Sequence, residues 1–598
     1  MRERCEYKLT LTVVSPFLFE SIINARLGVD CAQMRNEAGR PIIPAAQVKG
    51  VVRDALETLA SRTKLITESD IDTLFGKSSL RGADDSNEPS RGTAIFSDLI
   101  AADAPEKPEG HTTRIEIDDE TGAVKTGALQ VIELSSRFGT EVAFSGSLIV
   151  CYPPGLDRNK CENALAKALK LIPAIGALKS AGFGAVKEGG SALECLGTRP
   201  LALPAAVSGE RITYRVAFDR PLLVDSRYIA ENVFESAKIV PGAAFKGPLA
   251  NRLKLAGVEP ESDPDWSRAL AQLRISHAFP LVEGRAAEYP IPASIVFSQE
   301  ADGIEYADAI AGEFGRAPLW SGDVAQFVAP AKKDIQKDWR GRAEMPEWRA
   351  DLLPRTHIAI NEKGDASGQR RIAFDERLYT SAESMLYVTV MLPTRGHEWL
   401  LTVDAGRLED KVRAAQLIAM LEEGLYGVGK TDARPHLTRI DRPAEPDVPA
   451  PGTVDLMLKT PAVLFDPLQQ PHDLDSSMAH RYAAYFNEKL GAALQNVFAR
   501  QSMAGGYLAM RRRPYHAYYP FVLTEAGAVF RLNVPDAACQ QKLADALRFG
   551  LPVPDLGGKP ASWHICPFMP ENGYGEVVLH KPPGLRDGAL TFIDEARE

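Results

Sequence analysis

The sequence lacks the features that mark secreted, membrane and zinc-binding proteins. Its seven cysteines are scattered along 598 residues without a CxxC pair, so neither a disulfide framework nor a zinc knuckle is predicted. No apolar run approaches the length that crosses a bilayer. The N-terminal segment alternates polar and apolar residues like a strand, instead of forming the continuous apolar core of a signal peptide. We therefore expect a cytoplasmic protein.

The chain also lacks an excess of positive charge. With 69 Lys and Arg against 79 Asp and Glu, its formal net charge is −10. Proteins that bind phosphate backbones normally carry a basic surface, so this balance argues against a nucleic-acid partner. It does not exclude one, because a long chain can line one groove with Lys and Arg while its outer face stays acidic.

A repeat organises this long chain. Its length predicts about three to four domains. An alternating strand at 7–16 leads to PIIPAAQVKG and an amphipathic helix within 41–60, and a second strand at 212–224 leads to KIVPGAAFKG and a helix within 238–257. Both copies share the pattern [IV]-P-[AG]-A-x-[VF]-K-G. Two occurrences in the same chain order indicate duplicated units.

Glycine-rich turns and linkers set the expected limits of the units. The turns lie at 175–186 and 422–431, and segments rich in Pro and small residues lie at 200–210 and 441–452. We expect a first unit at 1–203, a second at 208–440 and a divergent third at 452–598. The third has a strand-like opening, a helix expected at 482–498 and a terminal glycine turn, but no proline–lysine–glycine element.

The order of strands and helices predicts the fold class. Strand, helix, strand followed by strand, helix, strand favours an α+β protein of tandem ferredoxin-like (RRM-like) units, with helices on one face of each sheet. The segments at 60–93 and 297–355 exceed a minimal unit and are expected to be insertions.

These motifs together resemble the repeat-associated mysterious protein (RAMP) superfamily. The first unit looks like the backbone subunit of type III CRISPR effectors, and the fusion of units resembles the type III-D arrangement. The resemblance implies that each unit grips part of a CRISPR guide RNA, that a hairpin thumb splays the guide from a single-stranded target RNA, and that other effector subunits are partners.

The resemblance also places a catalytic carboxylate between the first strand and the helix. Asp30, Met34, Arg35, Gly39 and Pro44 match the family pattern, although alanine follows Pro44 where glycine is usual. The implied activity is metal-dependent endonuclease cleavage of target RNA through the adjacent 2′-hydroxyl. Mg²⁺ or Mn²⁺ held by Asp30 through waters would suit this chemistry, because such cations need few protein ligands.

Other interpretations of the aspartates stay open. A loop Asp is most often a turn cap, and without the resemblance that interpretation of Asp30 is preferred. In the second unit Arg227 stands at the corresponding distance from the proline, so Asp225, two residues earlier, is only a second catalytic candidate.

Several basic residues are candidate RNA contacts. Lys49 and Lys246 precede glycine at helix starts, where N–H groups favour phosphate, and Lys179 and Lys430 lie in glycine-rich turns. The GVGKT segment that contains Lys430 is not a P-loop, because it follows a helix and lacks the earlier glycine. In the third unit, arginines interleave with aromatic residues, a mixture that suits stacking on unpaired bases but is equally typical of a half-exposed strand. The candidate contacts are Lys49, Arg53, Lys179, Lys246, Lys430, Arg511, Arg512 and Tyr515.

Three competing functions remain. The chain is a guide-bound endoribonuclease subunit, a structural backbone subunit without cleavage, or a guide-maturation endonuclease that uses metal-free acid–base chemistry. An unrelated multidomain enzyme would differ from all three by carrying no nucleic acid after purification.

Overall fold

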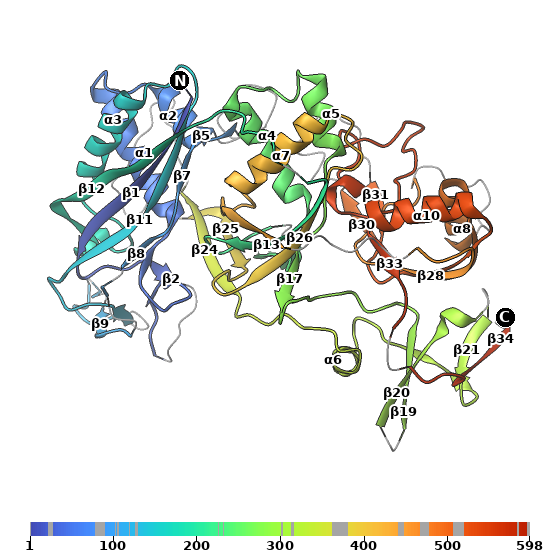
Figure 1. Ribbon diagram of the computed structural model, residues 1–598. Helices are drawn as coiled ribbons and strands as arrows, with labels where there is room; N and C mark the ends of the chain where they lie inside the picture. Colours follow the sequence, from blue (N-terminus) through green and yellow to red (C-terminus); the bar gives the residue numbers. More distant parts are fainter. Residues whose placement is uncertain are drawn as a thin grey trace.

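A computed structural model gives the architecture of the chain (Figure 1). It describes all residues apart from 1, 22–27, 78–89, 102, 105–106, 116, 119, 126–128, 208, 225–226, 231–232, 301–302, 313–315, 361–380, 441–447, 467–477, 506–519, 583–584 and 595–598. Helices and mainly antiparallel sheets are combined in an α+β fold, as the sequence predicts. Within the described residues, no helix is both long enough and apolar enough to cross a membrane.

The first unit folds as a βαββαβ sheet. In the sheet, the fourth strand lies beside the first, then the third, then the second, which is the ferredoxin-like order. The second position is shared by two short strands, β7 and β8. The elements are β1 (Glu3–Val14), α1 (Ala45–Arg62), β7 (Ala94–Phe96), β8 (Leu99–Ala101), β11 (Glu141–Tyr152), α3 (Arg158–Lys170) and β12 (Ala185–Pro200), with β4 (Ile42–Ile43) at the edge.

The second unit repeats this topology. Its first strand pairs with the third and the fourth strand in the same order. The second position is again divided, here between β16 and β17. The elements are β13 (Arg211–Phe218), α4 (Ala243–Ala256), α5 (Pro264–Gln272), β16 (Arg274–Ile275), β17 (Phe279–Val282), β18 (Arg285–Ala286), β26 (Glu398–Asp404), α7 (Lys411–Glu423) and β27 (Pro435–Ile440).

The third unit has the same topology although it lacks the repeat motif. Its sheet order is β29-β32-β28-β33, so the fourth strand again flanks the first. The prediction of a helix through residue 498 is wrong: the helix ends at Leu490, Gly491 takes a left-handed φ of 75°, and β29 follows. The elements are β28 (Gly452–Leu458), α8 (Met478–Leu490), β29 (Ala493–Phe498), β32 (Val529–Val534), α10 (Ala537–Phe549) and β33 (Val577–Leu579).

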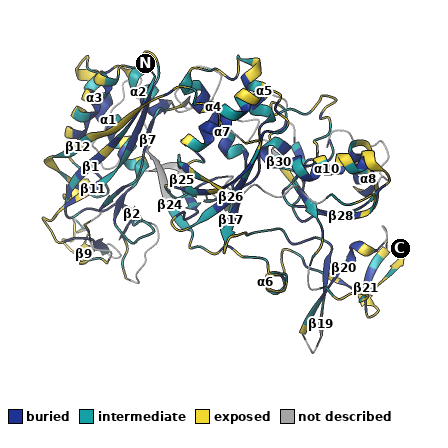
Figure 2. Ribbon diagram, viewed as in Figure 1, coloured by how far each residue is buried: buried dark blue, intermediate teal, exposed yellow. Residues whose placement is uncertain are grey.

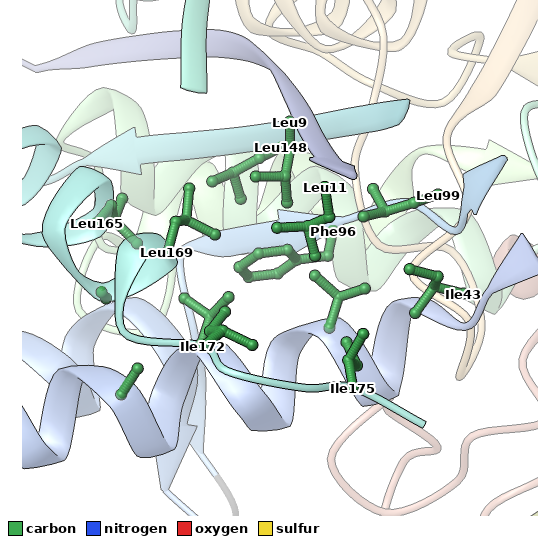
Figure 3. Packing of buried hydrophobic residues seen from close by; sticks show 14 of the residues in the cluster. Leu9, Leu11, Ile43, Phe96, Leu99, Leu148, Leu165, Leu169, Ile172 and Ile175 are labelled. Atoms are coloured by element: carbon green, nitrogen blue, oxygen red, sulfur yellow. The ribbon is translucent and has the colours of Figure 1, made fainter. Parts of the chain in front are cut away.

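Each sheet buries one face under its helices. Along β1 every second residue from Cys5 to Val13 is buried, because alternate side chains of a strand point to opposite faces. Helix α1 buries Val48, Val52 and Leu56, which recur at helical spacing. In Figure 3, side chains of the sheet strands, such as Leu9 and Phe96, pack against Ile172 and Ile175, which follow α3. Separate hydrophobic clusters of the same kind lie in the second and third units, and the outer helix faces are exposed (Figure 2).

Extra elements are inserted between the sheet strands. Each unit carries a hairpin or ribbon between its second and third positions, formed by β9 (Gly110–Arg114) and β10 (Gln130–Leu134), by β24 (Leu353–Ile360) and β25 (Ser381–Met391), and by β30 (Gln501–Gly505) and β31 (Pro520–Thr524). In the second unit, β14 (Arg227–Ala230) and β15 (Val233–Glu235) extend that ribbon. The first unit also contains α2 (Glu68–Phe75), β5 (Gly76–Lys77) and β6 (Ser90–Arg91).

A larger insertion in the second unit meets the end of the chain. It contains β19 (Ile295–Glu300), β20 (Gly303–Asp308), the 3-10 helix η2 (Ala309–Ala311), β21 (Arg316–Trp320), β22 (Asp323–Val324), β23 (Gln326–Phe327) and α6 (Lys333–Arg342). The last strand, β34 (Leu590–Asp594), pairs with β21 (Figure 1). This strand falls inside the range 452–598 expected for the third unit, but its partner belongs to the second. The expected unit limits at 203–208 and 440–452 stay predictions.

Candidate functional site

Asp30 lies in the loop between β1 and α1 and is exposed. Its backbone N–H donates to the carbonyl of Val131 on β10 over 2.8 Å, and its Oδ2 accepts the Val131 N–H over 2.7 Å. The carboxylate is therefore fixed against the inserted hairpin while remaining open to solvent. This position is compatible both with a turn cap and with an acidic group presented to a ligand.

A second carboxylate lies close to the same loop. Cys31 donates to Oε1 of Glu20 over 3.4 Å and accepts from the Gln130 amide over 2.9 Å. Burial and the carboxylates of Glu20 and Asp30 raise the pKa of Cys31 to about 11. Glu20 was not a candidate from sequence, because only the pairing of β2 (Glu20–Ser21) with β3 (Ala32–Gln33) brings it beside Cys31.

Asp30 and Glu20 are the acidic side chains that this part of the described chain offers to a cation. Among the described residues, no group of three or more His, Cys, Asp or Glu could enclose a metal ion. One exposed carboxylate with a second acidic side chain nearby leaves most of the coordination to water and substrate oxygens. Mg²⁺ accepts such a site, whereas Zn²⁺ normally needs three or four protein ligands.

Arg35 holds the loop in place. Its guanidinium forms an ion pair with Glu133 over 2.6 Å and donates to the carbonyl of Gly39 over 2.8 Å. Gly39 has a φ of 75°, which alanine would adopt only with strain. Met34 is buried beneath this turn. The motif residues around Asp30 thus shape the loop and leave Asp30 as its exposed member.

Lys49 is a half-buried cation in the second turn of α1. Among the described residues it has no hydrogen bond or ion pair, and burial together with the charges of Arg53 and Arg91 lowers its pKa. Arg53 is engaged by Glu57, Asp72 and the carbonyl of Gly76. Arg91 reaches the second unit, donating to the carbonyl of Gly427 over 2.9 Å and pairing with Asp432. The Lys49 cluster (Lys49, Arg53 and Arg91) therefore has one uncompensated ammonium, which suits an anion.

The other predicted basic contacts lie apart from this cluster. Lys179 is exposed in a 3-10 turn (η1, Lys179–Ala181) between left-handed residues. Lys430 is exposed, and its ammonium lies 5.0 Å from the ring of Phe234. Lys246 donates over 3.2 Å to the carbonyl of Ala271 near the end of α5. Asp225, Arg511, Arg512 and Tyr515 lie outside the described residues, so their roles stay predictions.

Lys246 supplies a test of local electrostatics. Burial lowers its pKa to about 7, below the value of roughly 10.4 for an unfolded chain. Between these two pH values the unfolded state therefore binds more protons than the folded state. The free energy of unfolding rises as pH increases from 7 to 10, and this gain is lost again as pH falls to 7. Lys246→Met should flatten this dependence.

At pH 6 the Lys246→Met variant should be more stable by roughly 1 to 3 kcal/mol, because residual hydration reduces the full penalty of about 1.4 kcal/mol per pKa unit. Urea unfolding at pH 6 and pH 9 measures the effect. Lys254→Met removes an exposed ion pair from the same helix and should change stability little. Parallel pH profiles for wild type and Lys246→Met would contradict the assignment.

The fold and the loop define a class of protein: tandem ferredoxin-like units with a fixed, exposed acidic loop in the first. Residues 10–187, which make up most of the expected first unit, match the family model of the RAMP superfamily. No curated protein matches the chain. Among solved structures, a chain of the type III-B Cmr-beta complex, described as bound to cognate target RNA and AMPPnP, is similar at 11% identity with a TM-score of 0.30. The similarity covers 53% of this chain and 86% of that chain.

Proposed function

We propose that the chain is a subunit of a type III CRISPR effector that binds guide and target RNA, and that Asp30 in its first unit cleaves the target. One observation carries the proposal. In the unit that matches the RAMP superfamily, a fixed and exposed carboxylate precedes a helix whose Lys49 ammonium has no ion pair among the described residues. The partners are guide RNA, single-stranded target RNA and other effector subunits.

The chemistry assigned to the loop is attack by a 2′-hydroxyl on the adjacent phosphate. The attack forms a 2′,3′-cyclic phosphate and breaks the bond from phosphorus to the 5′-oxygen, which leaves as a hydroxyl after taking a proton from water. The turn held by Val131 N–H fixes Asp30 where it can accept the hydroxyl proton or hold a hydrated cation. Asp30, with Glu20 nearby, would hold Mg²⁺ or Mn²⁺ through waters. The cation supplies neutralisation of charge on the phosphate in the transition state. Lys49 would bind a neighbouring phosphate, and Arg35 keeps the loop shaped.

A second function, a structural RNA-binding subunit without cleavage, has its own support. The hydrogen bond from Val131 to Asp30 is what a turn cap makes. Guide and target binding would then persist while other chains cut the RNA. Asp30→Asn and Asp30→Ala separate the two functions.

RNA binding is tested first with Lys49→Gln. Removing the ammonium should weaken RNA binding about fivefold. The slope of the logarithm of the binding constant against the logarithm of salt concentration should become less steep by about 0.7 to 1, because one phosphate contact is lost. Fluorescence anisotropy with labelled single-stranded RNA at several salt concentrations measures both quantities. Lys64→Gln, at an exposed position beyond α1, is the matched control. An unchanged slope, or purified protein without absorbance from bound RNA, would count against the proposal.

A further inference from the structure

The three units are joined by the same kind of contact. Each unit has one residue at an equivalent position at or just after the end of its second helix. These residues are Pro173 in the first unit, Tyr426 in the second and Phe549 in the third. The places are equivalent because Gly176 and Gly429, three residues further on, each approach the carbonyl of a leucine that follows the first strand, Leu18 and Leu223. In the third unit, the N–H of Leu551 bonds to Gly575 as that of Ile175 bonds to Gly184.

Tyr426 of the second unit docks on the open face of the first sheet, the face without helices. It is buried against Ile95 and Ile149, and the guanidinium of Arg4 lies 5.0 Å from its ring. These three residues alternate with the core residues of β7, β11 and β1, so they lie on the face opposite α1 and α3. An aromatic residue thus joins a face made of aliphatic side chains and one arginine.

Phe549 of the third unit makes the corresponding contact with the second sheet. Arg274 on β16 donates to its carbonyl over 3.1 Å, and the guanidinium of Arg407 lies 4.2 Å from its ring. The neighbouring Arg548 pairs with Asp404 on β26 over 2.9 Å. The second helix end of each following unit therefore sits on the open face of the preceding one.

The open face of the third sheet is covered by the chain itself. Ile310 of η2 packs with Met457 and Val529, which alternate with the core residues of β28 and β32. The amide of Asn496 on β29 donates to the carbonyl of Gly312 over 2.8 Å, and His580 bonds to Asp308 over 2.6 Å. We name η2 with Asp308 and Gly312 the cap, since it occupies the place that a next unit would take.

In the first unit, no described residue covers the corresponding docking position. Pro173 is exposed, and Leu171 beside it is 49% exposed. Its equivalents, Tyr426 and Phe549, contact a preceding unit, so the repeated interface itself indicates what fits here. The fitting surface is the open face of another ferredoxin-like sheet that carries an arginine, as Arg4 and Arg274 do at the two interfaces.

We propose that the cap terminates the array at the third unit and that the α3 end of the first unit docks on the open sheet face of a different chain. A second copy of this chain does not fit, because its three open faces are covered by the second unit, the third unit and the cap. A head-to-tail interface that does not close would otherwise produce filaments, and end caps with atypical surfaces prevent this in repeat proteins. The inference rests on the repeated interface and not on RNA cleavage.

The test removes the cap. Light scattering should find the wild-type chain monomeric over the micromolar range. Ile310→Glu combined with Asn496→Ala should free the third open face, so that oligomers grow with concentration. Adding Leu171→Glu should return this variant to a monomer, because a carboxylate would be buried in the new contact. Circular dichroism and tryptophan fluorescence establish that each variant is folded.

Three outcomes would overturn the proposal: a wild-type chain that forms filaments, a folded uncapped variant that stays monomeric, or oligomers that survive Leu171→Glu. If the uncapped variant does not fold, a photo-crosslinking amino acid at position 171 replaces it, in the complex purified from cells. The expected crosslink joins position 171 to a sheet strand of a different chain. A crosslink to another copy of this chain, or none at all, would refute the proposed docking.

Discussion

Asp30→Asn is expected to reduce target-RNA cleavage at least about a hundredfold, while guide binding is retained. The amide oxygen of asparagine can still accept the Val131 N–H that now reaches Oδ2 over 2.7 Å, so the turn is preserved. The amide is neutral, however, and neither accepts a proton nor holds a hydrated cation well. The variant thus separates the chemistry of the carboxylate from its role as a turn cap.

The measurement is cleavage of labelled target RNA by the purified complex with Mg²⁺ or Mn²⁺, and with a chelator. Asp157→Asn is the matched control, because Asp157 is also an exposed carboxylate that accepts a backbone N–H in the first unit, from Lys160 over 3.0 Å. Full cleavage by Asp30→Asn, with lower stability in Asp30→Ala, would establish a structural role. Cleavage that persists in the chelator would remove the cation from the proposal.

Local signals made the repeated helices predictable. Helix α1 begins at Ala45, and α4 begins at Ala243, next to the proline turns that the shared motif marks. The common topology of the third unit was less accessible, because it depends on pairing between strands such as β28 and β32, which lie far apart in sequence. The pairing of β21 with β34 is more distant still. Strand periodicity shows which residues face the core but does not choose the partner strand.

The candidate site was predictable only in part, for the same reason. The motif marked the loop of Asp30 and the helix of Lys49, but the proximity of Glu20 to Cys31 depends on tertiary pairing. Arg53 and Lys246 were both predicted to contact RNA. The structure shows that Arg53 is held by two carboxylates and that Lys246 bonds to a helix-end carbonyl. Sequence indicates the charge of a side chain but not which neighbour already satisfies it.

Glu576→Gln is expected to destabilise the contact between the second and third units by about 3 to 5 kcal/mol. Glu576 accepts from the ammonium of Lys459 over 3.0 Å, and Arg274 lies 3.9 Å away. Lys459 is otherwise enclosed by the rings of Phe279 and Tyr289, at 4.4 and 5.1 Å. Loss of the carboxylate leaves two mostly buried cations uncompensated, which costs more than loss of a surface pair.

Calorimetry should show the transition of the third unit lowered by roughly 10 °C. The double variant Lys459→Met, Glu576→Gln should recover part of the loss, because the stranded ammonium is removed as well. Glu141→Gln, which breaks the exposed pair with Lys187, should change the midpoint little. A midpoint in Glu576→Gln equal to that of wild type would show that the pair contributes nothing.

The same pair predicts a dependence on acid. Burial alone would raise the pKa of Glu576, but the charges of Lys459 and Arg274 outweigh it and hold that pKa below its usual value. The folded state therefore keeps the carboxylate charged at a pH where the unfolded chain is protonated. Its stabilisation is present above the unfolded pKa of roughly 4.3 and is lost as pH falls through the lower folded value. Once pH falls below that folded value, the midpoints of wild type and Glu576→Gln should converge, since both then carry an uncharged side chain beside Lys459.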